Sequence, residues 1–259
     1  MTIATTARKR LSLTMLRLEG LRQLRNPYTL AFTLAMPVVM YLLFGASADY
    51  ADLSAGNGNV SFYVMASMAA YGTAVAMSSL TSLAAAEAQQ GWGRQLAMTP
   101  LSTAGYALIK LLTALGFAVL ALFAVFTAGL LTGAQAEESW RWAAVAGIIL
   151  LTGTMFGLYG LGVGLFFNAD SSAALASISM TFFAFFGNVF MPLDGVMLDL
   201  ARLTPLYGFV ALSRWPLTDG TLTTGQTDPL WAVLLNIVVW LAVFAVLVLA
   251  GARRSRRRR

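Results

Sequence analysis

The sequence contains no cysteine and no histidine, and only 11% of its 259 residues are charged. Without cysteine the chain has neither disulfides nor thiolate nucleophiles, and without histidine it lacks imidazole bases and the commonest metal ligands. We therefore expect no catalytic residue, no metal site and no enzyme activity, because an activated serine also needs an oriented base. With 58% apolar residues and a mean hydropathy of +0.73, the composition instead indicates a membrane protein.

Uncharged runs identify the membrane spans. A helix that crosses the hydrocarbon core needs about 20 residues, and a charge at its centre costs about 2.5–3.5 kcal/mol. The sequence predicts an all-α integral membrane protein, a single domain over residues 1–259 with six transmembrane helices. The six runs are Asn26–Ala48, Leu53–Ala86, Leu111–Ala136, Trp142–Ala169, Ser171–Leu193 and Pro229–Ala252.

The basic residues predict the orientation. Six spans place both termini on the same side, and the side richer in Lys and Arg is normally cytoplasmic. One face carries Arg8, Lys9, Arg10, Arg17, Arg22, Arg25, Arg94, Lys110, Arg253, Arg254, Arg256, Arg257, Arg258 and Arg259, whereas the other carries Arg141, Arg202 and Arg214. We expect a multi-pass protein of the plasma (inner) membrane with cytoplasmic termini. The arginine tail is then a topology anchor at the lipid headgroups, not a nucleic-acid arm, and Lys110 snorkels at a span end.

Two segments outside the spans are amphipathic or apolar. Residues 8–26 place leucines opposite arginines at helical spacing over Leu11–Arg25, which predicts an interfacial elbow helix ended by Asn26-Pro27. Residues 192–228, between the fifth and sixth spans, include an uncharged run too short to span, Leu203–Ser213. Together with Pro205 near its start, this pattern favours short re-entrant helices that dip into the outer leaflet.

The longest internal connection on the basic side is the loop over residues 84–103. Strong helix formers precede Gly91, Trp92 and Gly93, a short amphipathic stretch follows from Arg94, and Thr99-Pro100-Leu101-Ser102 ends it. We interpret the loop as a short helix between two spans that can transmit force, the alternative being a solvated loop without a partner.

Two spans carry unusual residue patterns. The fourth contains Gly153, Gly157, Gly160 and Gly164, and this small-xxx-small spacing predicts close helix packing within the chain or across a dimer. The fifth contains Phe182, Phe186, Phe190 and Met191. These side chains suit a pliable pathway for a hydrophobic solute, and equally a packed bundle or lipid contact.

With these features placed, the chain resembles the membrane subunit of type-2 ABC exporters, the ABC-2 permease family. The resemblance covers most of the chain and includes the elbow helix, the Arg25-Asn26-Pro27 entrance with Pro37, and the re-entrant segment. Its most specific part is the coupling loop, where the matching positions are Glu87, Gly91, Leu96, Thr99, Pro100, Leu101 and Ser102. Arg94 and Ala88 depart from the commoner family pattern.

The resemblance implies a permease that moves a hydrophobic or amphipathic drug, antibiotic or lipid out of the cytoplasm or inner leaflet. A separate cytoplasmic ATPase would bind ATP and Mg, because this sequence has no nucleotide-binding signature. The expected assembly has two permeases, identical or paired non-identical, two ATPases and surrounding lipid. The residues expected to couple to the ATPase are Glu87, Gly91, Trp92, Arg94, Leu96, Thr99 and Pro100.

Two other classes remain open at the level of sequence. An ion-coupled secondary carrier would normally place carboxylates within its spans, and none lies within the six runs, although backbone carbonyls can also bind sodium. A membrane scaffold without transport activity needs no chemistry at all.

Overall fold

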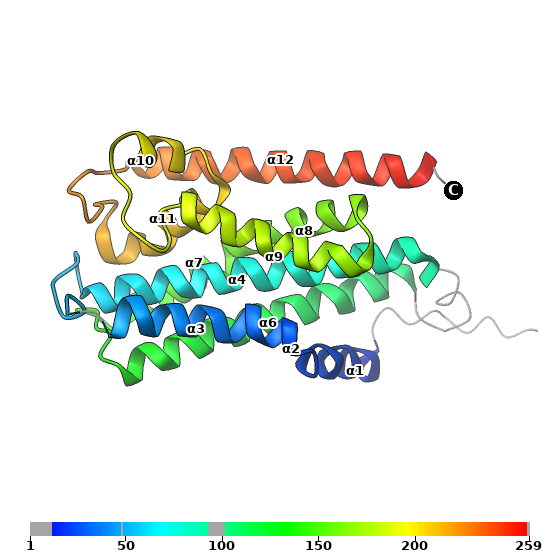
Figure 1. The fold of residues 1–259 in the computed structure, drawn as a ribbon, viewed down its shortest axis with the longest axis horizontal. Coiled ribbons are helices and arrows are strands. Elements are labelled where there is room, and N and C mark those ends of the chain that lie inside the picture. The colour runs from blue at the N-terminus through cyan, green and yellow to red at the C-terminus, as the bar shows by residue number, and fades with distance from the viewer. Residues whose placement is uncertain (1–11, 48, 93–101, 258–259) are drawn as a thin grey trace, which may run out of the picture.

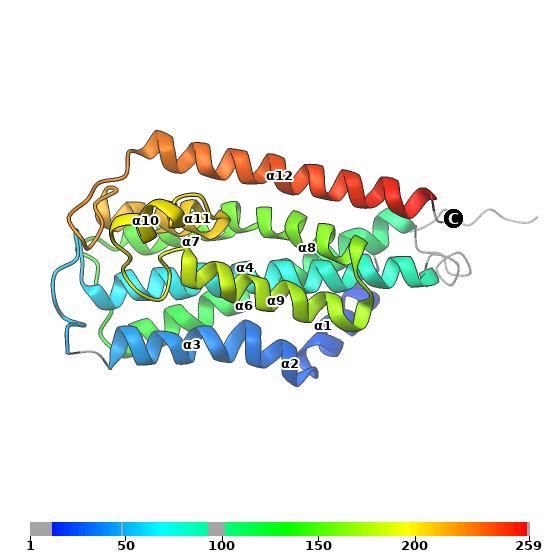
Figure 2. The same ribbon diagram turned by 45° about the horizontal axis from the view of Figure 1, so that its top comes forward.

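The computed structural model describes residues 12–47, 49–92 and 102–257, and every regular element in these ranges is helical. Most of the helices lie along one common axis (Figures 1 and 2). In chain order they are α1 (Leu13–Leu24), α2 (Pro27–Leu30), η1 (Ala31–Ala35), α3 (Met36–Tyr41), η2 (Leu42–Ala46), α4 (Val60–Glu87), η3 (Ala88–Trp92), α6 (Thr103–Leu131), α7 (Trp140–Gly153), α8 (Met155–Phe166), α9 (Ala169–Phe186), α10 (Gly195–Ala201), α11 (Pro205–Thr218) and α12 (Leu230–Arg257), where η marks a π-helix.

The helices agree with five of the six predicted spans. Five continuous helices are long and apolar enough to cross a membrane, namely Pro27–Ala46, Val60–Gln90, Gly105–Leu131, Trp140–Phe166 and Leu230–Arg254. The run predicted as the fifth span, Ser171–Leu193, forms the shorter helix α9, whose 18 residues measure about 27 Å. It stops at Phe186 because Gly187 follows and Asn188 takes a left-handed conformation with φ of 57°.

The segment between α9 and α12 folds into two helices instead of a plain loop. Helices α10 and α11 meet at an angle of 94°, which makes the pair either a broken span or a re-entrant loop. Thr204 caps α11 by accepting a hydrogen bond from the Tyr207 amide, and Pro205 occupies its first turn. The bend therefore lies where the sequence has Thr204-Pro205.

Helix α4 forms the centre of the bundle. Of the 18 residues in its apolar stretch, 89% are buried in the bundle. In the apolar stretch of α12 only 11% are buried. It packs closely against α6, α8 and α9. Most of its residues are small, and small residues let neighbouring backbones approach where lipid supplies no hydrophobic drive.

A tight corner joins α1 to the first span. Asn26 accepts hydrogen bonds from the amides of Tyr28 and Thr29, and Pro27 takes the first helical position. Helix α1 and the carboxyl-terminal ends of α4 and α12 lie together at one end of the bundle, which we call the α1 end (Figure 1). Helix α11 and the connections at residues 49–59 and 132–139 lie toward the other end, the α11 end (Figure 1).

Candidate functional site

Three buried charged side chains meet at the α1 end, and a fourth, half-exposed one joins them. Glu19 comes from α1, Glu87 from the last turn of α4 and Lys110 from α6, and all three are at most 8% exposed. The Nζ atom of Lys110 lies 2.7 Å from Glu19 Oε1 and 2.7 Å from Glu87 Oε2. Arg22 of α1 completes what we call the charge cluster, because its guanidinium bonds Glu87 and lies 3.6 Å from Glu19.

The charge cluster is electrically balanced and well supplied with hydrogen bonds. Tyr106 donates to Glu87 over 3.0 Å, and Gln23 donates to Glu19 over 3.1 Å. Burial alone would lower the pKa of Arg22, but its hydrogen bond and ion pair with Glu87 outweigh burial and raise that pKa above its usual value. Because two cations face two carboxylates, removing one member leaves an uncompensated charge in a buried site.

The charge cluster ties three helices together beside the coupling loop. Glu87 is bound to both cations inside the chain, and α4 continues through η3 to Trp92. Lys110 is 6% exposed and paired with two carboxylates. The interpretation of Lys110 as a snorkelling residue is therefore wrong, since its ammonium group points to acids on α1 and α4 instead of the membrane surface.

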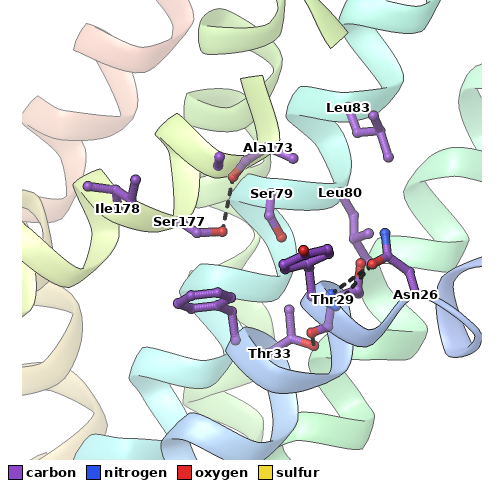
Figure 3. Close-up of a pocket in the computed structure, with 12 residues that line it drawn as sticks. Asn26, Thr29, Thr33, Ser79, Leu80, Leu83, Ala173, Ser177 and Ile178 are labelled. Atoms are coloured by element: carbon purple, nitrogen blue, oxygen red, sulfur yellow. Dashed lines mark hydrogen bonds between the residues drawn. The ribbon is translucent and has the colours of Figure 1, made fainter. Parts of the chain in front are cut away.

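A cavity of about 410 Å³ opens near the α1 end, between the first span, α4 and α9 (Figure 3). We call it the Thr29 cavity. Its walls carry no charged residue, and their polar groups are mostly hydroxyls, including those of Thr29, Thr33, Ser79 and Ser177. Three of these hydroxyls donate to carbonyls of their own helices, those of Thr33, Ser79 and Ser177. The cavity thus offers apolar surface and a few acceptor oxygens.

A second cavity of about 410 Å³ lies toward the α11 end, and we call it the Arg214 cavity. It shares two elements with the Thr29 cavity, the first span and α4, and the rest of its wall comes mainly from the segment after α9, Asn188–Pro192, and from α11. Along α4 the two cavities are about 22 Å apart, from Val64 to Ser79. The wall is mainly aromatic and aliphatic, and among the described residues that line it Arg214 is the charged one.

A closed layer separates the two cavities at Tyr71 of α4, which is fully buried. The Tyr71 hydroxyl lies 2.8 Å from Thr181 Oγ1 of α9 and 3.9 Å from the sulfur of Met36 in the first span. The Tyr71 ring meets Phe190 edge to face, with 5.2 Å between ring centroids. Side chains from the first span, α4, α9 and the segment after α9 therefore meet between the cavities.

The structure distributes the predicted pathway residues over two places. Phe190 and Met191 line the Arg214 cavity together. The rings of Phe182 and Phe186 contact each other at a tilt, with 4.7 Å between centroids. They are 59% and 36% exposed and belong to neither cavity wall. Only half of the predicted set therefore lies in a cavity.

The four predicted packing glycines all face α4. A Cβ atom at Gly160 or Gly164 would lie 2.1 or 2.0 Å from the carbonyl oxygen of Ser78 or Ser82. A Cβ atom at Gly153 or Gly157 would meet the side chain of Thr73 or Met77 of α4. At Gly160 and Gly164 the α8–α4 contact is thus one of backbone on backbone.

The residues predicted to couple to an ATPase are described in part. The backbone at Gly91 and Trp92 belongs to η3, while Arg94, Leu96, Thr99 and Pro100 lie outside the described residues. Beyond the loop, Ser102 caps α6 through the Gly105 amide. The connection therefore leaves α4 and enters α6 directly beside the charge cluster.

Sequence reasoning missed Glu19, Lys110, Tyr71 and Arg214 as site residues. Glu19 and Lys110 are 91 positions apart, so no local pattern pairs them. A signal did exist, because Glu19 is the single acid in a basic amphipathic segment and Lys110 is one of two lysines in the chain. Arg214 entered only as a charge that helped to assign topology.

Comparison with known proteins agrees with this architecture. The family model for the ABC-2 type transporter matches residues 10–215. A protein of Bacillus subtilis (strain 168) named "Putative transport permease YvfS" is 25% identical over 238 residues, which cover 88% of this chain and 91% of that protein.

Proposed function

We propose, from the premise that the chain belongs to the ABC-2 type transporter family, that it is the permease subunit of an ATP-driven exporter. The cargo is a hydrophobic or amphipathic drug, antibiotic or lipid, taken from the cytoplasm or the inner leaflet. The resemblance of the coupling loop and the absence of a nucleotide-binding signature in the sequence support a separate ATPase that holds ATP and Mg. Two permeases and two ATPases make up the transporter.

The observation that carries the proposal is the pair of cavities on one side of α4. Two spaces of similar volume share the first span and α4 as walls, and the side chains around Tyr71 lie between them. An occluding layer between an inner and an outer cavity is what a two-state pathway needs, since the layer can open to one side after the other closes. The uncharged Thr29 cavity suits the apolar part of a cargo molecule.

The charge cluster supplies the mechanical link from the ATPase to this pathway. Because Glu87 is bound inside the chain, we assign it a positioning role and leave direct contact with the ATPase to the loop from Gly91 onward. A displacement of that loop by the ATPase moves Glu87 at the end of α4. The ion pairs of Glu87 with Lys110 and Arg22 then move α6 and α1 with it. Helix α4 then carries the displacement to both cavity walls, because close-packed interiors move as bodies.

Reconstitution tests the proposal. The permease is purified in mild detergent with its bound ATPase, placed in vesicles with a hydrophobic fluorescent cargo, and assayed with ATP, with ADP and with an imposed proton or sodium gradient. Export driven by ATP but not by ADP or by either gradient is the expected result. Cargo movement by the permease alone along an ion gradient would overturn it in favour of a secondary carrier.

A secondary carrier finds little support in the cavities. Neither of the two cavity walls contains a carboxylate, the group by which a carrier would normally bind its coupling ion. The buried carboxylates Glu19 and Glu87 are both neutralised by cations.

A further inference from the structure

Arg214 of α11 is buried in the wall of the Arg214 cavity, with 4% of its surface exposed. Its Nε donates to Ser67 over 2.7 Å, and one terminal nitrogen, Nη2, donates to the carbonyls of Asn188 and Val189 over 3.0 and 3.4 Å. The guanidinium carbon lies 4.0 Å from the centre of the Tyr63 ring. All of these partners are neutral.

Four other cationic side chains of the described residues form ion pairs with carboxylates. Arg22 and Lys110 bind Glu19 and Glu87, Arg141 binds Glu138, and Arg202 binds Asp199 and Asp228. Among the described residues, Arg214 is the buried cation for which no carboxylate lies within ion-pair distance.

An arginine without a counter-ion is costly in this setting. Removing a charge from water is unfavourable, and neutral hydrogen bonds offset this cost only in part. The cation–π contact with Tyr63 also stabilises the guanidinium but supplies no counter-charge. The guanidinium has five donors in a planar fork that matches a carboxylate or a phosphate, and its bonds to Ser67, Asn188 and Val189 are made by Nε and Nη2.

The rest of the cavity wall defines the body of the ligand. Apart from Arg214, the wall is dominated by aromatic and aliphatic side chains, among them Phe44, Tyr50, Val64, Phe190 and Met191. A volume of about 410 Å³ accommodates an apolar chain or ring system of drug size. An apolar space with one cation at its wall is complementary to an amphiphile that carries a single negative group.

We propose that the Arg214 cavity binds an amphiphile with one carboxylate or phosphate group, and that Arg214 is its counter-ion and determines this specificity. As a statement about cargo, the proposal rests on the proposed function and restricts its substrate class to anionic amphiphiles. The same chemistry fits the headgroup of an anionic lipid that stays bound. In either case Arg214 acts on a ligand, whereas a purely structural arginine would only hold the chain after α9 through Asn188 and Val189.

The test measures binding to the full-length permease in nanodiscs of phosphatidylcholine, without ATP. Radiolabelled dodecanoate is the anionic probe and dodecanamide its neutral analogue, and empty nanodiscs correct for partition into lipid. We expect the protein to bind dodecanoate at least about tenfold more tightly than the amide, a difference of about 1.4 kcal/mol. Equal binding of the two probes would overturn the proposal.

Two pairs of variants separate the charge from the fold. Arg214→Gln should lose at least about tenfold in dodecanoate affinity and nothing in amide affinity, while Arg214→Lys should retain most of the preference. Met191→Glu places a carboxylate in the same cavity and leaves every native contact of Arg214 in place, so it should abolish the preference for dodecanoate. Met191→Gln is its neutral match, and Met197→Glu adds a carboxylate on α10, outside the cavity.

The Met191 pair keeps the proposal falsifiable if Arg214→Gln does not fold. If Met191→Glu binds dodecanoate as well as Met191→Gln does, the guanidinium is no counter-ion and the proposal fails. If Met197→Glu weakens binding as much as Met191→Glu does, the effect is a general surface potential and the proposal fails as well.

A second measurement distinguishes the two sources of the anion. In vesicles with the ATPase present, a cargo anion stimulates ATP hydrolysis and appears on the far side, whereas a resident lipid co-purifies with the permease and does neither. Binding in nanodiscs requires no ATPase, so failure of the proposed export function would leave the binding result standing. Export without selective dodecanoate binding would conversely overturn only the anion site.

Discussion

Lys110→Met is the sharpest test of the charge cluster. The substitution keeps the length of the side chain but removes the ammonium group that lies 2.7 Å from both Glu19 and Glu87. Two carboxylates then share one cation, Arg22, whose side chain is 48% exposed. Breaking a buried pair costs about 3–5 kcal/mol, and we expect the lower end because Arg22 still contacts both acids.

Thermal unfolding in detergent measures this cost. For a chain of this size 1 kcal/mol corresponds to about 2–4 °C in Tm, so Lys110→Met should lower Tm by about 6–12 °C. Adding Glu19→Gln restores the charge balance, since Glu87 and Arg22 then face each other as one pair, and should recover at least about half of the loss. Arg17→Met, which removes an exposed cation from α1, is the matched control and should change stability by at most about 0.5 kcal/mol.

The double variant Lys110→Met with Glu19→Gln tests whether unbalanced charge causes the loss of stability. If Lys110→Met with Glu19→Gln is as unstable as the sum of the two single variants, the cost is not one of unbalanced charge and the account of the cluster is refuted. The same variants should also lower cargo export per ATP hydrolysed, because α1 and α6 would no longer follow α4. Normal coupling in a destabilised Lys110→Met protein would restrict the cluster to a structural role.

Three further predictions follow from the cavity layer, the glycine contact and the loop. Tyr71→Phe removes a hydrogen bond worth about 1 kcal/mol and should raise ATP-independent dye leakage from vesicles about fivefold, with no increase if Tyr71 is not an occluding residue. Gly160→Ala places a Cβ against a backbone carbonyl and should destabilise the protein by about 1–3 kcal/mol in thermal unfolding, whereas Gly116→Ala, where a Cβ meets nothing within 4 Å, should not. A bulky charge at Gly91 or Leu96 should leave ATP hydrolysis in place and reduce export about tenfold; undiminished export would remove the loop from the coupling path.

The spans could be predicted from the sequence because their cause is local. A charge inside hydrocarbon is so costly that uncharged runs outline the helices, and five continuous helices lie within or close to the predicted runs. The end of α9 was harder to predict from the sequence. Its end depends on Gly187 and on the left-handed Asn188, which composition counts do not register.

The site depends on contacts between distant segments, so less of it could be predicted. The fourfold glycine spacing in the fourth span indicates a close helix contact but not that α4 is the partner. The charge cluster joins positions from Glu19 to Lys110, and a count of charges by membrane side treats them as unrelated. Arg214 illustrates the same limit, since a charge count records its sign and not the missing counter-ion.

The burial of α4 has a consequence for how the sequence can vary. A helix enclosed on nearly all sides accepts a larger side chain only if its neighbours retreat, and α8 approaches it down to the main chain at Gly160 and Gly164. Helix α12 tolerates changes in side-chain size, because most of its surface lies outside the bundle. There one aliphatic residue can replace another. Random mutagenesis should therefore find variants of α12 in abundance and leave α4 nearly invariant in size.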